Sequence, residues 1–527
     1  MQKLILLPAI IIISAITAFS QKYADFVHIQ WGAALKEKKT NTLDDIVGYD
    51  DSGFFITKSV KRKIFIEHFN QELKKTNSRE LVIEEGGKKR LYQGIKQING
   101  ELYLFSSFLN QKHKKHYLFV QTLNKQTLLP ENDVKKIAEI ELQDRIFWNA
   151  GMYGIDLSRD SSHVLIYYDT PAHTAENKTF GVHVFDKEMN EEWEKFVTLP
   201  YEEDLFEVER FEVDNEGNVY IMGIAFKQKR KEKRNGQPNF IYEVLAYSDQ
   251  GESMVKYPIS LPGKFITDAQ LTINNKKQIV CGGFYSEEGT WSIIGSFFLT
   301  VNIDTKEVAT SSTKEFGIDF IAQNLTKHKE AKTRRKAEKG KDVELYKYDL
   351  HKIVPRSDGG AVLIGEQYFM QVSTTTTTDA SGRMTYSTDY IFNYNDIIVI
   401  NINPDGTIAW NTKIGKEQTT KNDLGFYSSF ALAVVDDNLY FIFNDNPKNL
   451  MYNGSGKLYN FRKDPDALTV VVKVDKTGEQ TRKALFAAGL KDVLTRPKVC
   501  EQVSSHEVIL YGERKKDQRL ARLVFDE

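Results

Sequence analysis

The segment VDNEGNVYIMG (residues 213–223), followed by IYEVLAYSDQGESMVKYPISL (residues 241–261), decides the fold. It contains a tight turn, an alternating apolar strand ending near a glycine, a connection, a second apolar strand, another tight turn and an outer strand. Asp, Asn and Gly tolerate the positive φ angles of tight hairpins, so DNEG and SDQG predict turns between strands. Together with the strand before the first turn, the unit is predicted to be a four-stranded antiparallel sheet.

The same unit recurs along the chain. A second clear copy is PRSDGGAVLIGEQY (355–368) with DIIVININPDGTIAWNTKI (396–414), and a third is VVDDNLYFIFND (434–445) with LTVVVKVDKTGEQTRKALF (468–486). Four weaker copies occupy much of the first 310 residues. Recurring four-stranded units are typical of a β-propeller, so we predict an all-β chain with about eight blades, or seven if one weak copy is miscounted. Two β-sandwich domains are the alternative, but no Pro- or Gly/Ser-rich hinge divides the chain.

The last copy is incomplete, and the start of the chain offers the missing piece. Residues 498–525 supply only three strands. FVHIQWGAAL (26–35) has the pattern of an unpaired outer strand, with Trp31 placed like Trp193 and Trp410 in their own copies. An outer strand from one end that completes the blade begun at the other closes a propeller and protects its edges. Removal of residues 21–36 is therefore predicted to destabilise the fold.

The N-terminal residues predict export. Lys3 precedes an apolar run over 4–19, and Ala18 and Ser20 place small residues at a cleavage site after Ser20, which is typical of a signal peptide. An uncleaved membrane anchor is the alternative. The mature domain is then a single propeller over 21–527 with no further transmembrane segment. Because the chain ends within a blade strand, without an appended sorting domain, the periplasm is expected rather than the cell exterior.

Composition excludes several classes of function. The 71 Lys and Arg residues balance 72 Asp and Glu residues, so no global charge indicates nucleic acid as a partner. Cys281 and Cys500 each lie in a strand-like run, which favours buried thiols over a disulfide, and their spacing fits no metal or redox motif. The scattered histidines, including His163 and His183 in strands, are expected to be packed or surface positions. No metal, cofactor or catalytic residue is predicted.

The connections predict an elaborated face. The first-to-second and third-to-fourth turns are short in every clear copy, whereas long insertions at 226–239, 317–348 and 368–395 fall in the second-to-third loops or the links between blades. Long loops on a rigid scaffold often carry binding residues. Two insertions are basic, and their candidate binding residues are Lys229, Arg230, Arg234, Arg334 and Arg335. They would attract an anionic partner, although solvated loops explain the same charges. A short helix is expected near 327–339.

The third insertion is rich in Thr and Tyr. Its Thr run and its Ser and Gly residues indicate a flexible tip, and the candidate binding residues are Tyr368, Tyr386, Tyr390 and Tyr394. Tyrosine offers an apolar face and a hydroxyl, which suits peptide or carbohydrate contact. A long hairpin with cross-strand tyrosine pairs is the alternative. Glu366, just before this insertion, is a candidate to face a central channel.

RSDGGAVLIGEQYF (356–369), its Thr/Ser-rich loop and YNDIIVININPDGTIAW (394–410) together resemble uncharacterised secreted proteins of the Bacteroidetes. The resemblance is specific over about 60 residues, from 356 to 410. It implies a location in a Gram-negative cell envelope and no particular activity. We therefore expect a monomeric, non-enzymatic binding or scaffold protein that recognises an envelope protein or glycan through its long-loop face. A polysaccharide-active hydrolase or lyase, with its site at the channel mouth, is the alternative.

Overall fold

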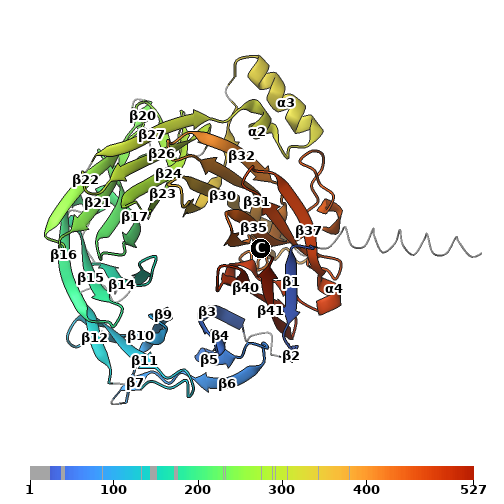
Figure 1. Ribbon diagram of the computed structural model, residues 1–527. Helices are drawn as coiled ribbons and strands as arrows, with labels where there is room; N and C mark the ends of the chain where they lie inside the picture. Colours follow the sequence, from blue (N-terminus) through green and yellow to red (C-terminus); the bar gives the residue numbers. More distant parts are fainter. Residues whose placement is uncertain are drawn as a thin grey trace, which may run out of the picture. The chain divides into compact units, whose positions relative to one another are not determined.

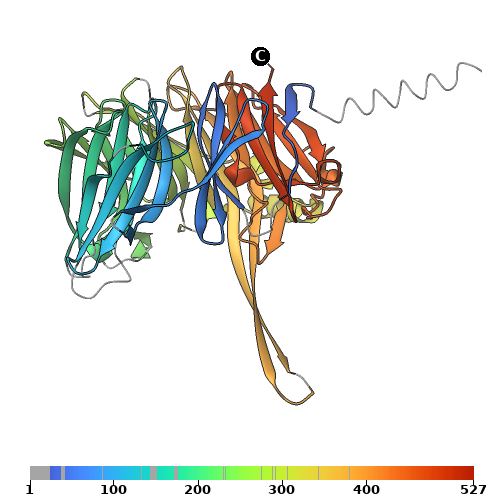
Figure 2. The same cartoon turned by 90° about the horizontal axis from the view of Figure 1, so that it is seen from below.

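A computed structural model describes residues 24–526, except residues 37–41, 86, 132, 143–150, 171–175, 229, 230, 232, 235, 275, 288, 291, 306, 342 and 379. Strands dominate this part of the chain (Figure 1, Figure 2). The expected signal segment 1–20 lies outside the described residues. Among the helices that are described, none is long and apolar enough to cross a membrane.

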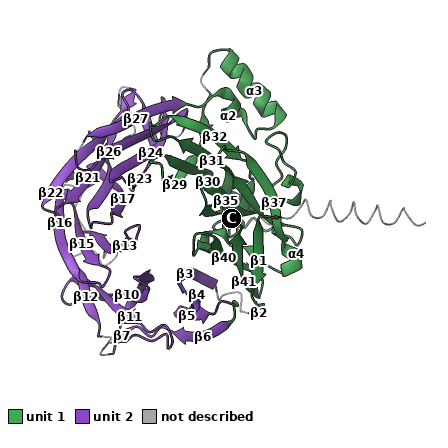
Figure 3. Ribbon diagram, viewed as in Figure 1, with its two compact units in different colours: residues 1–41, 72–74, 315–527 green, residues 42–71, 75–314 purple. Residues whose placement is uncertain are grey.

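The chain forms two compact units, which are described separately (Figure 3). Unit 2 comprises Thr42–Gln71 and Lys75–Lys314. Its described residues form five four-stranded antiparallel sheets, in which each strand pairs with the next long strand along the chain. The first three sheets are β3 (Thr42–Asp50), β4 (Gly53–Val60), β5 (Lys63–Phe69) and β6 (Lys75–Glu80); β9 (Leu91–Ile98), β10 (Glu101–Asn110), β11 (Lys115–Leu123) and β12 (Lys135–Glu141); and β13 (Tyr153–Leu157), β14 (His163–Asp169), β15 (Asn177–Asp186) and β16 (Glu191–Glu202).

The other two sheets of unit 2 carry short additions between their second and third strands. They are β17 (Phe206–Val213), β18 (Val219–Phe226), β21 (Phe240–Ser248) and β22 (Ser253–Ile259); and β23 (Phe265–Ile273), β24 (Gln278–Ser286), β26 (Gly295–Asn302) and β27 (Val308–Glu315). A small hairpin, β19 (Lys233–Arg234) with β20 (Gln237–Pro238), forms within the predicted insertion 226–239. The short strands β7 (Glu84–Glu85), β8 (Lys88–Lys89) and β25 (Ser292–Ile293) complete unit 2.

Unit 1 comprises Met1–Asn41, Glu72–Lys74 and Glu315–Glu527, and three sheets form in its described residues. The first is β29 (Tyr348–Pro355), β30 (Ala361–Thr378), β31 (Met384–Ile402) and β32 (Ile408–Ile414), with β33 (Gln418–Lys421) beside β31. The second is β34 (Ala431–Val435), β35 (Asn438–Asp445), β36 (Leu468–Val474) and β37 (Gln480–Ala487). The third combines β38 (Leu494–Thr495), β39 (Glu501–Gln502), β40 (Glu507–Arg514), β41 (Asp517–Phe525), β1 (Val27–Trp31) and β2 (Leu35–Lys36).

Helices are few in unit 1. They are α2 (Ile318–Ala322), α3 (Lys327–Glu338) and α4 (Ala488–Lys491), and β28 (Leu345–Tyr346) follows α3. The helix α3 confirms the short helix expected near 327–339. Eight sheets of four or more strands in the described residues match the predicted number of blades, and a series of four-stranded antiparallel sheets identifies the β-propeller fold class. Whether 21–527 form one continuous domain stays a prediction.

The N-terminal strand occupies the predicted position at the edge of the last sheet. β1 pairs antiparallel with β41, from Val27 opposite Phe525 to Trp31 opposite Ala521, and forms the outer strand of the last sheet. Val27 is buried, and the ring of Trp31 packs edge-on against Phe486 at 4.8 Å between centroids. This pairing confirms the composite last sheet; closure of a ring by this strand stays a prediction.

The tight turns follow the expected chemistry. In DNEG, Asp214 Oδ1 accepts the backbone N–H groups of Glu216 and Asn218, and Gly217 takes a φ of +77°, which glycine adopts without strain. The outer-strand tryptophan of the preceding sheet then binds the same turn, because Trp193 Nε1 donates to the Gly217 carbonyl at 3.1 Å. Trp410 Nε1 repeats this contact with the Lys476 carbonyl at 2.9 Å. These tryptophans therefore join adjacent sheets.

Cys281 and Cys500 are both free thiols, as the sequence predicts. Cys281 is buried among apolar side chains of unit 2, and burial raises the pKa of its thiol to about 12. Burial also raises the pKa of Cys500 to about 12, and its Sγ donates to the Arg496 carbonyl at 3.3 Å. Such thiols remain protonated at neutral pH and act as small apolar residues.

Candidate functional site

A two-stranded ribbon extends from the first sheet of unit 1. β30 and β31 contain 18 and 19 residues, about twice the length of most strands in this chain, and pair with each other from Ala361 opposite Ile402 to Thr378 opposite Met384. Figure 2 shows their distal halves projecting beyond the other strands of unit 1. The long hairpin that the sequence left open as an alternative is therefore what forms over 368–378 and 384–395. Threonine is β-branched and favours extended backbone, so the Thr run continues the strand.

All four tyrosines predicted from the sequence lie on one face of this ribbon. Tyr368 is opposite Tyr394, Val372 is opposite Tyr390 and Thr376 is opposite Tyr386. Because directly opposed residues of an antiparallel pair share a face, and alternate residues along a strand do too, these six side chains line one surface. The hairpin with a cross-strand tyrosine pair is thus confirmed at Tyr368 and Tyr394.

This surface, which we call the apolar face of the ribbon, is exposed along its outer part. Five large apolar side chains are between 47% and 67% exposed, and all of them belong to this face: Met370, Val372, Met384, Tyr386 and Tyr390. The opposite face carries Ser373, Thr375, Thr377, Thr385, Ser387 and Asp389. Thr374, Thr376, Thr378 and Thr388 lie on the apolar face between these side chains. Grouping of the exposed large apolar side chains on one face is expected of a strand pair that buries this face against another molecule.

The base of the ribbon is fixed. The rings of Tyr368 and Tyr394 pack at 4.7 Å between centroids, and Lys498 Nζ donates to the Tyr394 hydroxyl at 2.7 Å. β33 pairs with β31 from Ile391 opposite Lys421 to Tyr394 opposite Gln418. Beyond this point, within the described residues, no further strand pairs with the outer edge of 384–390 or with that of 369–378.

A buried ion pair lies directly below this base. Lys416 Nζ donates to Glu366 Oε1 at 2.6 Å, to the Tyr394 carbonyl at 2.9 Å and to Gln418 Oε1 at 3.0 Å. Ser429 Oγ donates to the other oxygen of Glu366 at 2.7 Å. The side chains of Glu366 and Lys416 are both 0% exposed. Glu366 therefore does not face a channel, which corrects the sequence-based expectation; its carboxylate holds the start of the ribbon to the segment that carries β33.

Glu366 remains ionised in this environment. Burial alone would raise the pKa of its carboxyl, but the Lys416 ammonium and the hydrogen bond from His351 outweigh burial, and the pKa lies below its usual value. His351 Nε2 lies 3.4 Å from Glu366 Oε2 and is partly exposed. A fully buried carboxylate that already binds three donors is a structural group rather than one that attacks a substrate.

Because the pKa of Glu366 is lowered in the fold, the stability of the protein depends on pH. A carboxyl whose pKa is lower in the folded state than in the unfolded state stabilises the fold at any pH above the unfolded-state pKa, which is near 4.5. This stabilisation is lost as the pH falls through the folded-state pKa. We expect Glu366→Gln to be less stable than the unsubstituted chain at neutral pH, and the difference to narrow on acidification. Urea denaturation across this pH range measures the difference. Glu72→Gln, at an exposed pair with Lys74, is the control and should leave the profile unchanged.

Only some of the predicted basic residues belong to the described residues. Lys229 and Arg230 lie outside them, and Arg234 belongs to β19. Arg334 is engaged within its own helical segment, with its guanidinium 2.7 Å from Asp319 Oδ1 and 3.0 Å from Glu330 Oε1. Arg335 is exposed on α3. Binding of an anionic partner by these basic residues stays a prediction.

Unit 2 contains a polar cavity of about 700 Å³ that the sequence did not indicate. The ring of Tyr167 stacks on Phe211 at 4.0 Å beside it, and Gly154 leaves room for that ring, because a Cβ there would lie 2.0 Å from it. Its charged lining residues are Asp156, Asp169, Lys178, Glu203, Glu209 and Arg210. They come from separate strands and connections, so no local motif could have revealed the cavity.

Comparisons with known proteins identify no family for this chain. No protein-family profile and no curated protein matches the chain. Among solved structures, the WD40 domain of SCAP from fission yeast is similar at 8% identity, covering 96% of this chain and 99% of that domain, with a TM-score of 0.39. The β-propeller domain of the Trilobed protease from Pyrococcus furiosus is similar at 10% identity, 85% and 96% coverage and a TM-score of 0.36. The polysaccharide lyase Uly1 is similar at 9% identity, 94% and 100% coverage and a TM-score of 0.33.

Proposed function

We propose that this chain is an exported, non-enzymatic binding protein of the bacterial envelope, and that its ribbon β30–β31 binds an extended segment of a protein partner. The observation that carries the proposal is the sorting of side chains on the ribbon. Its five exposed large apolar residues all lie on one face, together with several threonines, and none of the five lies on the other face. A two-stranded ribbon gains stability when a further strand or an apolar surface covers it.

The edge of β31 supports an extended peptide as the occupant. β33 already adds a strand at 391–394, and the Asn422 side chain ends that addition by accepting the backbone N–H of Tyr390 at 2.8 Å. The Asn422 backbone N–H also donates to the Tyr390 carbonyl, so a peptide that continues the line of β33 would pair with 384–389. Its alternate side chains would meet Tyr386 and the ring of Tyr390. Strand addition of this kind draws affinity from main-chain hydrogen bonds and specificity from alternate side chains.

Charge favours a polypeptide over an anionic membrane surface. The ribbon between Tyr368 and Asn395 contains only Asp379, Arg383 and Asp389 as charged residues, so it lacks the cluster of cations that anionic lipid attracts. The tyrosines of the apolar face supply large contact area with few rotatable bonds, as at many protein interfaces. No observation in the described residues favours a hydrolase or lyase over a binding protein.

A displayed library of random peptides, each long enough to form one strand, tests the proposal. We expect the whole protein to select peptides with apolar residues at alternate positions. Tyr386→Ser/Tyr390→Ser should weaken their binding more than about tenfold, because buried tyrosines are frequent hot spots. Thr375→Ala/Ser387→Ala, on the opposite face of the same segment, is the matched control and should bind as the unsubstituted protein does. Amide hydrogen exchange at 384–389 should slow on binding.

Three results would contradict this function. One is the absence of any peptide that distinguishes the tyrosine variant from the control. Another is co-sedimentation of the protein with lipid vesicles through the same tyrosines. The third is oligosaccharide binding or concentration-dependent self-association that is lost in the tyrosine variant while no peptide is selected.

A further inference from the structure

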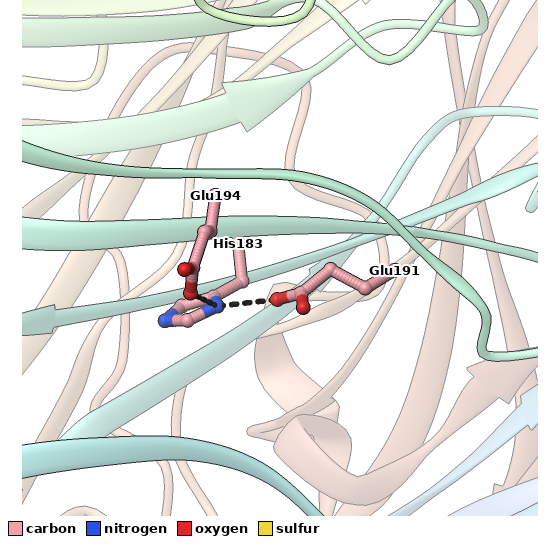
Figure 4. A group of neighbouring side chains, drawn as sticks. All are labelled: His183, Glu191 and Glu194. Atoms are coloured by element: carbon pink, nitrogen blue, oxygen red, sulfur yellow. Dashed lines mark hydrogen bonds and ion pairs between the residues drawn. The ribbon is translucent and has the colours of Figure 1, made fainter.

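A histidine and two glutamates converge in the hairpin of β15 and β16 in unit 2. Figure 4 shows both carboxylates directed at the same ring nitrogen of His183. Its Nδ1 lies 2.7 Å from Glu191 Oε1 and 3.3 Å from Glu194 Oε2. One ligand atom from each of the three residues lies within 4.8 Å of the other two.

A β-bulge creates this convergence. Glu194 is opposite His183, and Trp193 is opposite Val184, but the register then shifts so that Glu191 is opposite Phe185. In a regular strand, Glu191 and Glu194 would point to opposite faces, since three positions separate them. Because the bulge absorbs Glu192, Glu191 returns to the face of His183 and Glu194. Bulges that re-aim a side chain occur frequently at functional sites.

The imidazole is held in place while the carboxylates remain accessible. The His183 side chain is 9% exposed, and its ring packs near Tyr168 and nearly parallel to Phe185. Glu191 is 41% exposed and Glu194 is 67% exposed. A fixed imidazole and two solvent-facing carboxylates leave coordination positions open on the solvent side.

We propose that His183, Glu191 and Glu194 bind one Zn²⁺ ion. Zinc accepts imidazole nitrogen and carboxylate oxygen at about 2.0–2.2 Å in tetrahedral sites, which sets ligand atoms about 3.4 Å apart. Both distances from Nδ1, 2.7 Å and 3.3 Å, are shorter than that value, so small rotations that move the carboxylates apart from the ring suffice for coordination. One imidazole and two carboxylates suit zinc better than Mg²⁺ or Ca²⁺, which prefer sites made of oxygen alone. The remaining position belongs to water or to a group of a bound molecule.

The competing interpretation is an ion pair between protonated His183 and the glutamates. Unit 2 itself contains a comparison, since His163 Nε2 lies 3.3 Å from a single carboxylate, that of Glu192. An ion pair needs one carboxylate. A metal site needs further ligands, and at His183 the bulge brings a second carboxylate to the same ring nitrogen.

Isothermal titration of the whole metal-free protein with Zn²⁺ tests the proposal. We expect one site with micromolar or tighter affinity, and at least a tenfold loss in Glu191→Gln/Glu194→Gln, since even outer-shell substitutions weaken metal sites by about 10- to 100-fold. Substitution of Co²⁺ for Zn²⁺ should give the visible absorption of a low-coordinate nitrogen–oxygen site, and the glutamine variant should lack it. His163→Gln is the control, because it removes a histidine of the same sheet, on β14, without changing the bulge, and should leave Zn²⁺ binding unchanged.

Three outcomes would overturn the assignment. They are no Zn²⁺ binding at micromolar concentration, equal binding by the glutamine variant and the unsubstituted protein, and tighter binding of Mg²⁺ or Ca²⁺ than of Zn²⁺. Circular dichroism of the glutamine variant separates loss of a ligand from loss of folding. Because both carboxylates are exposed, we expect its spectrum to match that of the unsubstituted protein.

Discussion

Replacing Lys416 with methionine should lower the free energy of unfolding by about 3–5 kcal/mol, the usual cost of removing one partner of a buried ion pair. Methionine fills similar volume but cannot donate to Glu366 Oε1, to the Tyr394 carbonyl or to Gln418 Oε1. The Glu366 carboxylate would then remain fully buried without its cation. Urea denaturation monitored by tryptophan fluorescence measures the change.

Lys421→Met is the matched control for this experiment. Lys421 also pairs with a carboxylate at 2.6 Å, that of Asp389, but its side chain is 59% exposed. Exposed pairs contribute about 0–1 kcal/mol, so the two lysines differ in burial rather than in geometry. Equal effects of the two substitutions would show that the Glu366–Lys416 pair is not buried in solution.

A second variant separates the ion pair from local packing. Glu366→Leu/Lys416→Met removes both charges, and replacement of a buried pair by apolar residues is often neutral or stabilising. We therefore expect the double variant to be more stable than Lys416→Met alone. If it is less stable, hydrogen bonds from Ser429 and His351 contribute more than the charge balance does.

The blade plan could be predicted because each blade repeats local chemistry. The turn at Asp214 and the alternating strand after it specify a hairpin without any distant contact, and the same pattern recurs in other sheets. Trp193 and Trp410 stood at equivalent positions in their copies, and both bind the turn of the next sheet. For the Thr run the sequence left two alternatives, because Ser and Gly at the tip indicated flexibility whereas β-branched residues on both strands favoured a long hairpin.

The candidate sites depended on information that the sequence pattern lacks. Glu366 and Lys416 are 50 positions apart, and their pairing depends on how β33 folds back beside β31. The four tyrosines could be selected by type, but their common face requires the register of β30 and β31. His183 was expected to be a packed or surface position in a strand, and its side chain is 9% exposed in β15; the bulge that redirects Glu191 toward it leaves no signature in the residues themselves.

Deleting residues 24–36 should destabilise unit 1 by roughly 6 kcal/mol. Phe26, Val27, Ile29 and Trp31 belong to the apolar cluster of the last two sheets, and four such side chains contribute about 1.5 kcal/mol each at the low end of the range for burial. The deletion also leaves the edge of β41 without its partner strand, and a bare sheet edge promotes aggregation. Urea denaturation and light scattering measure the two consequences.

A synthetic peptide of residues 24–36 provides the decisive control for that deletion. Val27, Ile29 and Trp31 lie on one face of β1, while His28 and Gln30 are exposed on the other. This alternation of apolar and polar residues fixes the register in which the strand pairs with β41. Added to the truncated protein, the peptide should restore most of the lost stability. A peptide with His28→Ala and Gln30→Ala should act similarly, whereas one with Val27→Ser and Trp31→Ser should not. Unchanged stability of the truncated protein would show that the composite last sheet does not depend on β1.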